Sequence, residues 1–141
     1  MSTFSDFFAE NIEQTPNIKY VASKRIKNSA TGKPHEWEIR KLYQDENDAL
    51  IKACTKSIKQ RDGSVIKEVD RQKYMKELIA ASVVFPNLKD AALQDHYHVV
   101  GATELLSKLL SIGEYARLGD VILKHNDLDD DINELIDEAK N

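Results

Sequence analysis

The pattern of apolar and polar positions changes along the chain, from short alternating runs near the start to helical spacing in the second half. Apolar and polar side chains roughly alternate over residues 18 to 26 and again over residues 37 to 42. A period of two is typical of a half-buried strand, so we expect two strands that pair as a hairpin through the turn residues 28 to 34. Trp37 is expected to anchor this small sheet against a helix, because a large aromatic side chain dominates a modest core.

Helical spacing is clearest in the central stretch, residues 70 to 98. Four apolar side chains recur along one helical face, at Tyr74, Leu78, Ala81 and Phe85. We expect a long apolar helix that begins after an N-cap at Asp70 and ends at Phe85, because Pro86 forces the preceding residue out of helical geometry. Asn87 is the expected N-cap of a second helix.

Shorter elements are expected in the first half. Residues 3 to 12 predict a short amphipathic helix with its phenylalanines on one side, and residues 45 to 57 predict a second helix with an acidic first turn and a basic last turn. Asp62-Gly63, between two short polar runs, is a strong hairpin signal. Because this second hairpin is mostly charged, we expect it to project as an arm.

The second half predicts three further helices. Apolar residues at helical spacing over residues 102 to 110 define a buried face. Ser111 and Glu114 form a capping box for the next helix, which Asn126 is expected to end. A last helix opens with three aspartates, whose negative charge is favourable at the positive N-terminal end of the helix, and it carries four apolar residues on one face. These residues are Ile132, Leu135, Ile136 and Ala139.

The expected fold class is therefore α+β, with small antiparallel β hairpins and helices in the N-terminal half and a helical bundle in the C-terminal half. With 141 residues the chain has the size of one domain. We expect a single domain, residues 1 to 141, made of an α+β lobe over about 1 to 69 and an all-helical lobe over about 70 to 141.

Composition narrows the functional classes. Apolar residues make up 41% of the chain and charged residues 31%, and no run approaches the length of roughly eighteen apolar residues that a membrane span needs. The N-terminus lacks the basic start and apolar core of a secretory signal, so we expect a cytoplasmic protein. Cys54, the single cysteine, cannot form an intrachain disulfide and is expected to serve packing.

The net charge of −4 hides an asymmetry between the two halves. Residues 19 to 76 carry a balance of +7, residues 77 to 141 one of −8, and residues 1 to 18 add −3. Such a division is compatible with a basic surface for nucleic acid, with two faces that attract another copy or a mixed-charge partner, or with solvated faces of a soluble protein.

Candidate chemistry is sparse. Four acidic residues take ligand positions of a calcium-loop pattern, at Asp127, Asp129, Asp131 and Glu138. Ile132 stands where that loop needs glycine, so an acidic helix start is the better interpretation. His96 and His98 are two residues apart, a spacing that suits a metal pair only on a strand, and here the context is the end of a helix. We expect no metal and no cofactor.

Catalytic signatures are also missing from the sequence. The five glycines are dispersed and form no phosphate-binding loop, and no nucleophile has a local signature. We therefore expect a protein that is not an enzyme. A basic cluster of Lys24, Arg25 and Lys27 near Tyr20 is a weak signal for nucleic-acid binding, because a half-exposed strand gives the same pattern and the acidic total opposes phosphate affinity.

Several blocks of sequence, in order, carry a family resemblance. They are Ser23-Lys24-Arg25, Trp37-Glu38-Ile39-Arg40, Val84-Phe85-Pro86-Asn87-Leu88, Leu93-Gln94-Asp95 and Gly113-Glu114-Tyr115. Over most of residues 5 to 140 the chain resembles the XkdN-like tail assembly chaperones of tailed phages and phage-derived elements.

The resemblance implies a non-enzymatic protein of the host bacterial cytoplasm that holds the tape measure protein until the tail tube polymerises around it, and that is absent from the mature virion. A long, helical, apolar partner needs temporary cover from small proteins with apolar grooves and charged exteriors. Other tail proteins are further possible partners. A frameshifted longer product, known for related chaperone systems, is left open by the sequence.

The residues expected to provide this cover lie on two C-terminal helical faces. They are Leu105 and Leu109 on one helix, and Ile132, Leu135 and Ile136 on the last. For Leu105 and Leu109 a role in the core is the preferred interpretation, whereas the terminal helix is the better candidate because it is displaceable. A structural tail component and a phage nucleic-acid-binding protein remain the rival functions, and self-association through the oppositely charged halves is a separate expectation.

Overall fold

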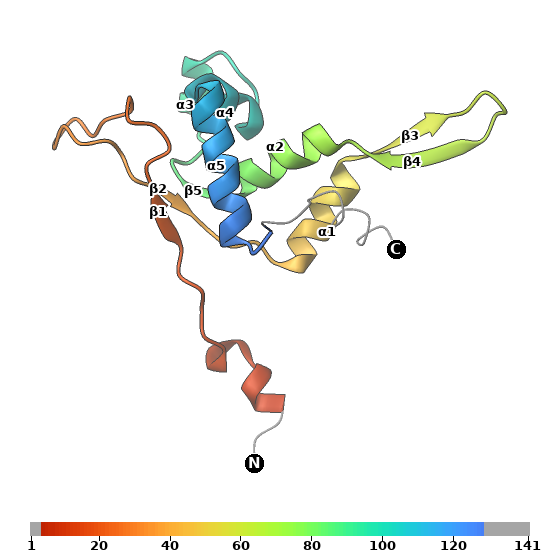
Figure 1. Cartoon of the computed structure of the whole chain (residues 1–141), viewed down its shortest axis with the longest axis horizontal. Helices are drawn as coiled ribbons and strands as arrows, with labels where there is room; N and C mark the ends of the chain where they lie inside the picture. Colours follow the sequence, from red (N-terminus) through yellow and green to blue (C-terminus); the bar gives the residue numbers. More distant parts are fainter. Residues whose placement is uncertain (1–3, 129–141) are drawn as a thin grey trace.

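The computed structural model describes residues 4–128, and over that range the chain mixes helices with short antiparallel strands (Figure 1). The strands are β1 (Ile18–Tyr20), β2 (Trp37–Ile39), β3 (Thr55–Lys59), β4 (Val65–Val69) and β5 (Val83–Phe85). The helices are α1 (Gln44–Ala53), α2 (Arg71–Ser82), α3 (Ala91–His96), α4 (Ala102–Leu109) and α5 (Ile112–His125). Two 3₁₀ turns, η1 (Phe4–Phe7) and η2 (Ala9–Asn11), precede them. The predicted α+β class is confirmed.

β1, β2 and β5 form an antiparallel sheet with β2 in the centre. The predicted pairing of the first two strands is confirmed, with Ile18 opposite Ile39. β1 ends at Tyr20, earlier than predicted, because the chain then turns inward and buries Ala22 and Ser23 in succession instead of alternating.

β5 is the strand that helical spacing did not predict. α2 ends at Ser82, and Val83 already lies opposite Ile39 on the free edge of β2. The predicted helix end at Phe85 is therefore wrong. Two valines and a phenylalanine favour strand geometry. Their pairing with β2 also provides hydrogen-bond partners for the backbone groups on that edge of β2, which would have none if the helix continued.

The helix caps of the central stretch were predicted in part. Asp70 caps α2 as expected, accepting the backbone N–H of Lys73 at 3.1 Å. The expected cap at Asn87 is wrong, because Asp90 caps α3 and accepts the N–H of Leu93 at 2.8 Å. The turn after β5 thus delays the start of α3 by three residues.

The β3–β4 hairpin projects from the body, as its charge predicted (Figure 1). The helix expected over residues 45 to 57 ends at Ala53, because Thr55 already pairs with Val69 in this hairpin. At the tip, the loop is longer than a two-residue turn, and Gly63 adopts a φ of +89°, a left-handed conformation that glycine tolerates best.

Buried residues from both halves of the chain share the larger core cluster. It contains Ala22, Trp37, Ile39, Ile79, Val83, Leu88, Val99, Leu105, Leu106, Leu110, Leu118 and Ile122. Trp37 is buried in the same cluster as Ile79 of α2, which agrees with its predicted role as an anchor. A smaller cluster joins α1, the base of the hairpin and α2 through Ile51, Cys54, Val69, Tyr74 and Leu78.

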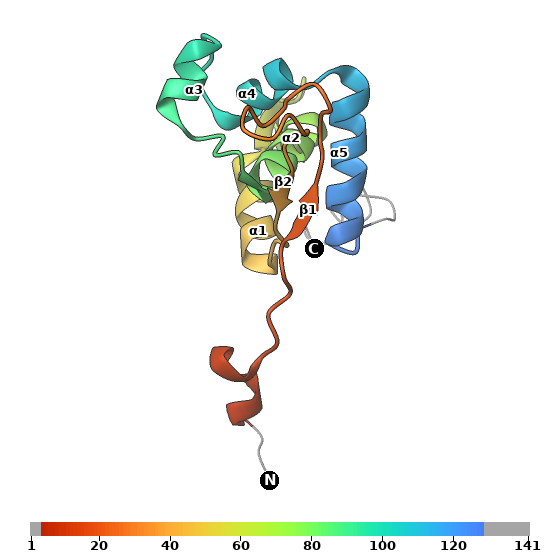
Figure 2. The same cartoon turned by 90° about the vertical axis from the view of Figure 1, so that its left-hand side faces the viewer.

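Residues 4–17, called the N-terminal arm below, extend away from the body in both views (Figures 1 and 2). The predicted helix over residues 3 to 12 is wrong over the part that the structure describes, where η1 and η2 are separated by Phe8 in extended geometry. Neither turn contains a buried residue. An isolated short helix is only marginally stable in water, and within the described residues no neighbouring surface covers the apolar face of this segment to stabilise it.

Candidate partner-binding cleft

Two arginines of the first half each hold the start of a helix. Arg25, in the segment after β1, donates to Glu114 from Nη2 to Oε1 at 2.6 Å and from Nε to Oε2 at 3.3 Å. Glu114 also accepts the backbone N–H of Ser111 at 2.9 Å, which completes the predicted capping box of α5. Because Arg25 and then the Ser111 N–H stabilise the carboxylate, the pKa of Glu114 lies far below its ordinary value of 4.5.

Arg40 repeats this arrangement at α1. Its guanidinium donates to both carboxylate oxygens of Glu46, and its Nε donates to the carbonyl oxygen of Ala81 at 3.1 Å. Glu46 accepts the backbone N–H of Tyr43 at 3.1 Å, and its pKa is lowered mainly by the hydrogen bond from Arg40. Arg40 therefore fixes the first turn of α1 against the last turn of α2.

A cleft of about 490 Å³ lies beside this connection. Its walls come from α1, α2, β5, the segment after β5 and the first residue of α4. The lining residues are Arg40, Leu50, Glu77, Ala80, Ala81, Val83, Val84, Asn87, Leu88, Lys89 and Ala102. Most are apolar, and three are alanines whose small side chains leave the space open. We call this feature the partner cleft.

The lining of the partner cleft includes an exposed apolar residue. Val84 is 41% exposed. Lys89 brings a positive charge to the lining and Glu77 a negative one, while the charge of Arg40 is paired with Glu46. An apolar concave surface with a few charged groups at its border is the geometry in which an amphipathic helix docks.

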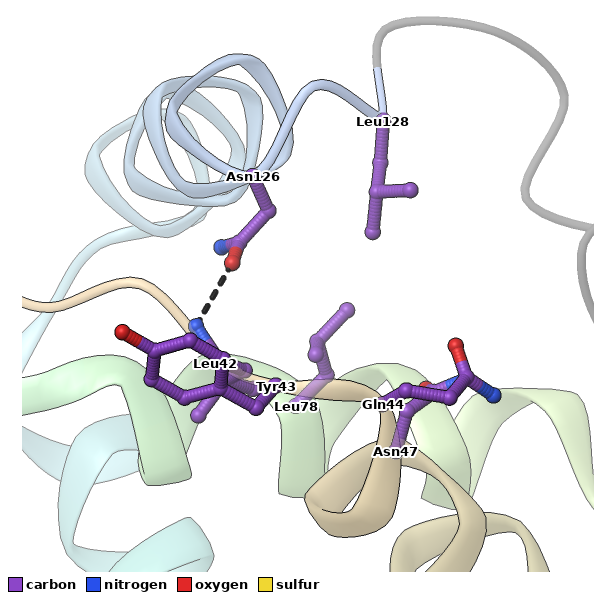
Figure 3. Close-up of a pocket in the computed structure, with 7 residues that line it drawn as sticks. All are labelled: Leu42, Tyr43, Gln44, Asn47, Leu78, Asn126 and Leu128. Atoms are coloured by element: carbon purple, nitrogen blue, oxygen red, sulfur yellow. Dashed lines mark hydrogen bonds between the residues drawn. The ribbon is translucent and has the colours of Figure 1, made fainter. Parts of the chain in front are cut away.

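A second, smaller hollow lies where the end of α5 meets α1 and α2 (Figure 3). Leu128 and Leu78 face its space of about 130 Å³, and Asn126 ends α5 there as predicted. The side-chain oxygen of Asn126 accepts the backbone N–H of Leu42 at 2.8 Å. This volume is below the usual range of ligand sites, so we assign the hollow to packing around the end of α5.

Comparison with known proteins shows the family. The sequence profile described as phage XkdN-like tail assembly chaperone protein matches residues 4–140. The chain belongs to this tail assembly chaperone family. Blocks that carry the resemblance meet in the chaperone's structure, because Arg25 contacts Glu114 across 89 positions, and Arg40 lines the same cleft as Val84 and Leu88.

Individual relatives agree with this assignment. The chaperone is 27% identical to the phage-like element PBSX protein XkdN of Bacillus subtilis over 131 residues, which cover 91% of this chain and 86% of that protein. It is 32% identical to the uncharacterized protein YqbN of the same species over 77 residues, or 54% and 52% of the two chains. The crystal structure of the protein YqbN shares the fold, with a TM-score of 0.73 at 20% identity over 89% of this chain and 97% of that one.

The partner-binding residues predicted from sequence lie away from the partner cleft or outside the described range. Leu105 is 0% exposed and belongs to the larger core cluster, in agreement with the core interpretation. Leu109 is partly buried against the same cluster. The remaining three, Ile132, Leu135 and Ile136, lie outside the described residues.

The other candidate residues of the chaperone have local roles. Cys54 is buried in the smaller cluster, as predicted, and burial raises the pKa of its thiol. Arg25 of the basic cluster is engaged by Glu114. Over residues 4–128, no group of three or more His, Cys, Asp or Glu side chains is placed to hold a metal ion, and no helix has the length and apolar character to cross a membrane.

Sequence reasoning did not find the Arg25–Glu114 contact or the partner cleft. The capping box was visible at Ser111 and Glu114, but a capping box gives no sign of which distant cation its carboxylate will bind. The cleft is formed by segments that are far apart in the sequence. The available signal was that the blocks carrying the resemblance include Arg25 and Glu114 of the contact and Arg40, Val84 and Leu88 of the cleft.

Proposed function

We propose that this chaperone acts without catalysis and holds the tape measure protein during tail morphogenesis, in the cytoplasm of the host bacterium. It is then released and is absent from the mature virion. The observation that carries the proposal is the partner cleft, whose mostly apolar lining includes the exposed Val84. Membership of the tail assembly chaperone family supports the choice of a tail protein as the partner.

The partner cleft suits one amphipathic helix of a longer protein. When the apolar lining covers an apolar stripe of the helix, the complex is stabilised by roughly 25 cal/mol for each Å² of apolar surface removed from water. Lys89 and Glu77 lie at the border, where they pair with the polar flanks of such a helix and select its direction. A tape measure protein, as a long helical chain, presents stripes of this kind in succession.

Further contacts come from the residues that the sequence indicated. Ile132, Leu135 and Ile136 stay predicted partner contacts, and Leu109 is a predicted contact at the edge of the body. Leu105 reaches a partner only after displacement of α4, because its side chain is fully buried. Other tail proteins that present an amphipathic helix are further partners under this proposal.

Co-expression with the tape measure protein, followed by pull-down, tests the proposal. Val84→Asp places a charge in the apolar lining and is expected to reduce capture by about tenfold or more, equivalent to about 1.4 kcal/mol. Val65→Asp in the β3–β4 hairpin is the matched control, since Val65 is also an exposed strand valine but lies away from the cleft. Circular dichroism of both variants confirms that folding is retained.

The same assay tests the predicted contacts of the last helix, and two further measurements test the rival functions. Replacing Ile132 and Ile136 by Asp should abolish capture and spare folding, whereas loss of folding would show that they are core. Presence of the protein in purified virions would make it a structural tail component. Absence of capture, together with salt-sensitive DNA binding that is lost when Lys24 and Lys27 are replaced, would favour the nucleic-acid alternative.

A further inference from the structure

The N-terminal arm carries an apolar surface that the rest of the described chain leaves uncovered. Phe4 is 82% exposed and Phe7 77%, and Phe8 and Ile12 are also exposed. Three phenylalanines and an isoleucine within nine positions form an apolar surface that water solvates poorly. An arm of this composition is expected to bind another surface.

The arm has the sequence pattern of an amphipathic helix although it is not helical in this structure. Its apolar residues, at positions 4, 7, 8 and 12, follow the spacing of one helical face. Asp6, Glu10 and Glu13 follow the same spacing on another face. The observed 3₁₀ turns are interrupted at Phe8, which has a φ of −70° and a ψ of 143°. A segment of this kind gains its helix when a groove covers the apolar face.

The sheet places the base of the arm near the partner cleft of the same chain. The arm enters β1 at Ile18, which lies opposite Ile39, and Ile39 lies opposite Val83 in the cleft lining. Neighbouring strands are about 4.8 Å apart, so Ile18 and Val83 are separated by roughly 10 Å across the sheet. The five residues 13 to 17 span up to about 17 Å when extended, which is enough to return the arm to the cleft.

The two surfaces match mainly in their apolar character. The arm brings aromatic side chains and three acidic groups, and the cleft offers an apolar lining with Lys89 as a cation and Glu77 as an anion, while Arg40 is already paired with Glu46. We propose that residues 4 to 12 fold as an amphipathic helix into the partner cleft of their own chain. In that position the arm covers Val84 while no other protein occupies the cleft.

A docked arm controls the access of the tape measure protein to the cleft, which deepens the proposed function. Only this control of access rests on the proposed function. Docking of the arm itself requires no tape measure protein. A tethered arm has an effective concentration in the millimolar range for a short flexible linker, so even a weak contact is populated. A partner helix of higher affinity displaces it.

Disulfide trapping in the full-length chain tests the docking. Cys54, the single cysteine, is first replaced by alanine, and Val84→Cys is combined with a cysteine at one of four arm positions: Phe4, Phe7, Phe8 or Ile12. The matched control carries Val65→Cys in the β3–β4 hairpin, where the valine is also exposed. We expect at least one Val84 pair to form an intramolecular disulfide at least tenfold faster than the corresponding Val65 pair in dilute solution.

Peptide mapping without reductant identifies the product. Failure of all four Val84 pairs, equal rates for Val65 and Val84, or a bond only between two chains overturns the inference, the last result indicating exchange of arms between copies. Replacing Asp6 and Glu10 by lysine is expected to slow the bond in the Val84 pairs and not in the Val65 pairs. If the chain captures the tape measure protein but no arm disulfide forms, only the docking of the arm is refuted. If a Val84 disulfide forms but the unmodified chain does not capture the tape measure protein, only the proposed function is refuted.

Discussion

At the scale of single residues, the same arrangement of a glutamate and an arginine occurs at the start of two helices. A glutamate at the third position of a helix accepts the backbone N–H at the helix start and, at the same time, the guanidinium of an arginine from the first half. Arg25 and Glu114 do this at α5, and Arg40 and Glu46 do it at α1. Each arginine forms a paired, planar contact that lysine cannot reproduce.

The Arg25–Glu114 pair predicts a dependence of stability on pH. Because the pKa of Glu114 is lowered in the folded state, its stabilising contribution is complete above the ordinary value of 4.5 and is lost as the pH falls through the lowered pKa. Glu114→Gln is therefore expected to lower the free energy of unfolding at pH 7, and the difference from wild type should shrink below pH 4.5. Urea denaturation at pH 7, 4 and 3 measures both effects.

Glu104→Gln is the control for this prediction, because Glu104 lies in the first turn of the neighbouring helix α4. Its substitution should leave most of the pH dependence between pH 7 and 3 in place. A constant difference between wild type and Glu114→Gln over this pH range would contradict the assigned role of the carboxylate.

At the scale of elements, the sequence predicted those whose signals are local. Asp70, the Ser111–Glu114 capping box and Asp62-Gly63 each act through neighbouring residues, and the structure has the expected element at each. β5 was missed because Phe85 continues the helical spacing of Tyr74, Leu78 and Ala81, although Val83 and Val84 also have strand propensity. Their strand geometry comes from pairing with β2, about 45 positions earlier.

The candidate site was less predictable than the elements for the same reason. The partner cleft combines residues from α1, α2, β5 and α4, and its volume depends on how these elements pack. The sequence pointed instead to apolar helical faces, since periodicity identifies a face without showing whether the core covers it. Leu105 belongs to such a face; the core was its preferred interpretation, and the structure buries that side chain completely.

At the scale of the whole molecule, contacts between the halves bear on how the chain unfolds. The larger core cluster contains Trp37 and Ile39 of the sheet together with Leu118 and Ile122 of α5. The predicted single domain of two lobes should therefore unfold in one transition. Fluorescence of Trp37, the single tryptophan, reports on the sheet, and far-ultraviolet circular dichroism reports mainly on the helices. We expect coincident urea transitions, and an earlier fluorescence transition would show lobes that unfold separately.

The charge asymmetry leads to a prediction about self-association. Residues 19 to 76 carry +7 and residues 77 to 141 carry −8, and some of this opposite charge is already paired within one chain, by Arg25 with Glu114 and by Lys41 with Asp127 at 3.3 Å. The opposite net charges of the two halves are expected to attract a second copy weakly. Because the screening length falls from about 30 Å at 0.01 M salt to about 10 Å at 0.1 M, static light scattering should show a mean mass above the monomer only at low salt. A monomer at both salt concentrations would show that attraction between the halves acts within the chain alone.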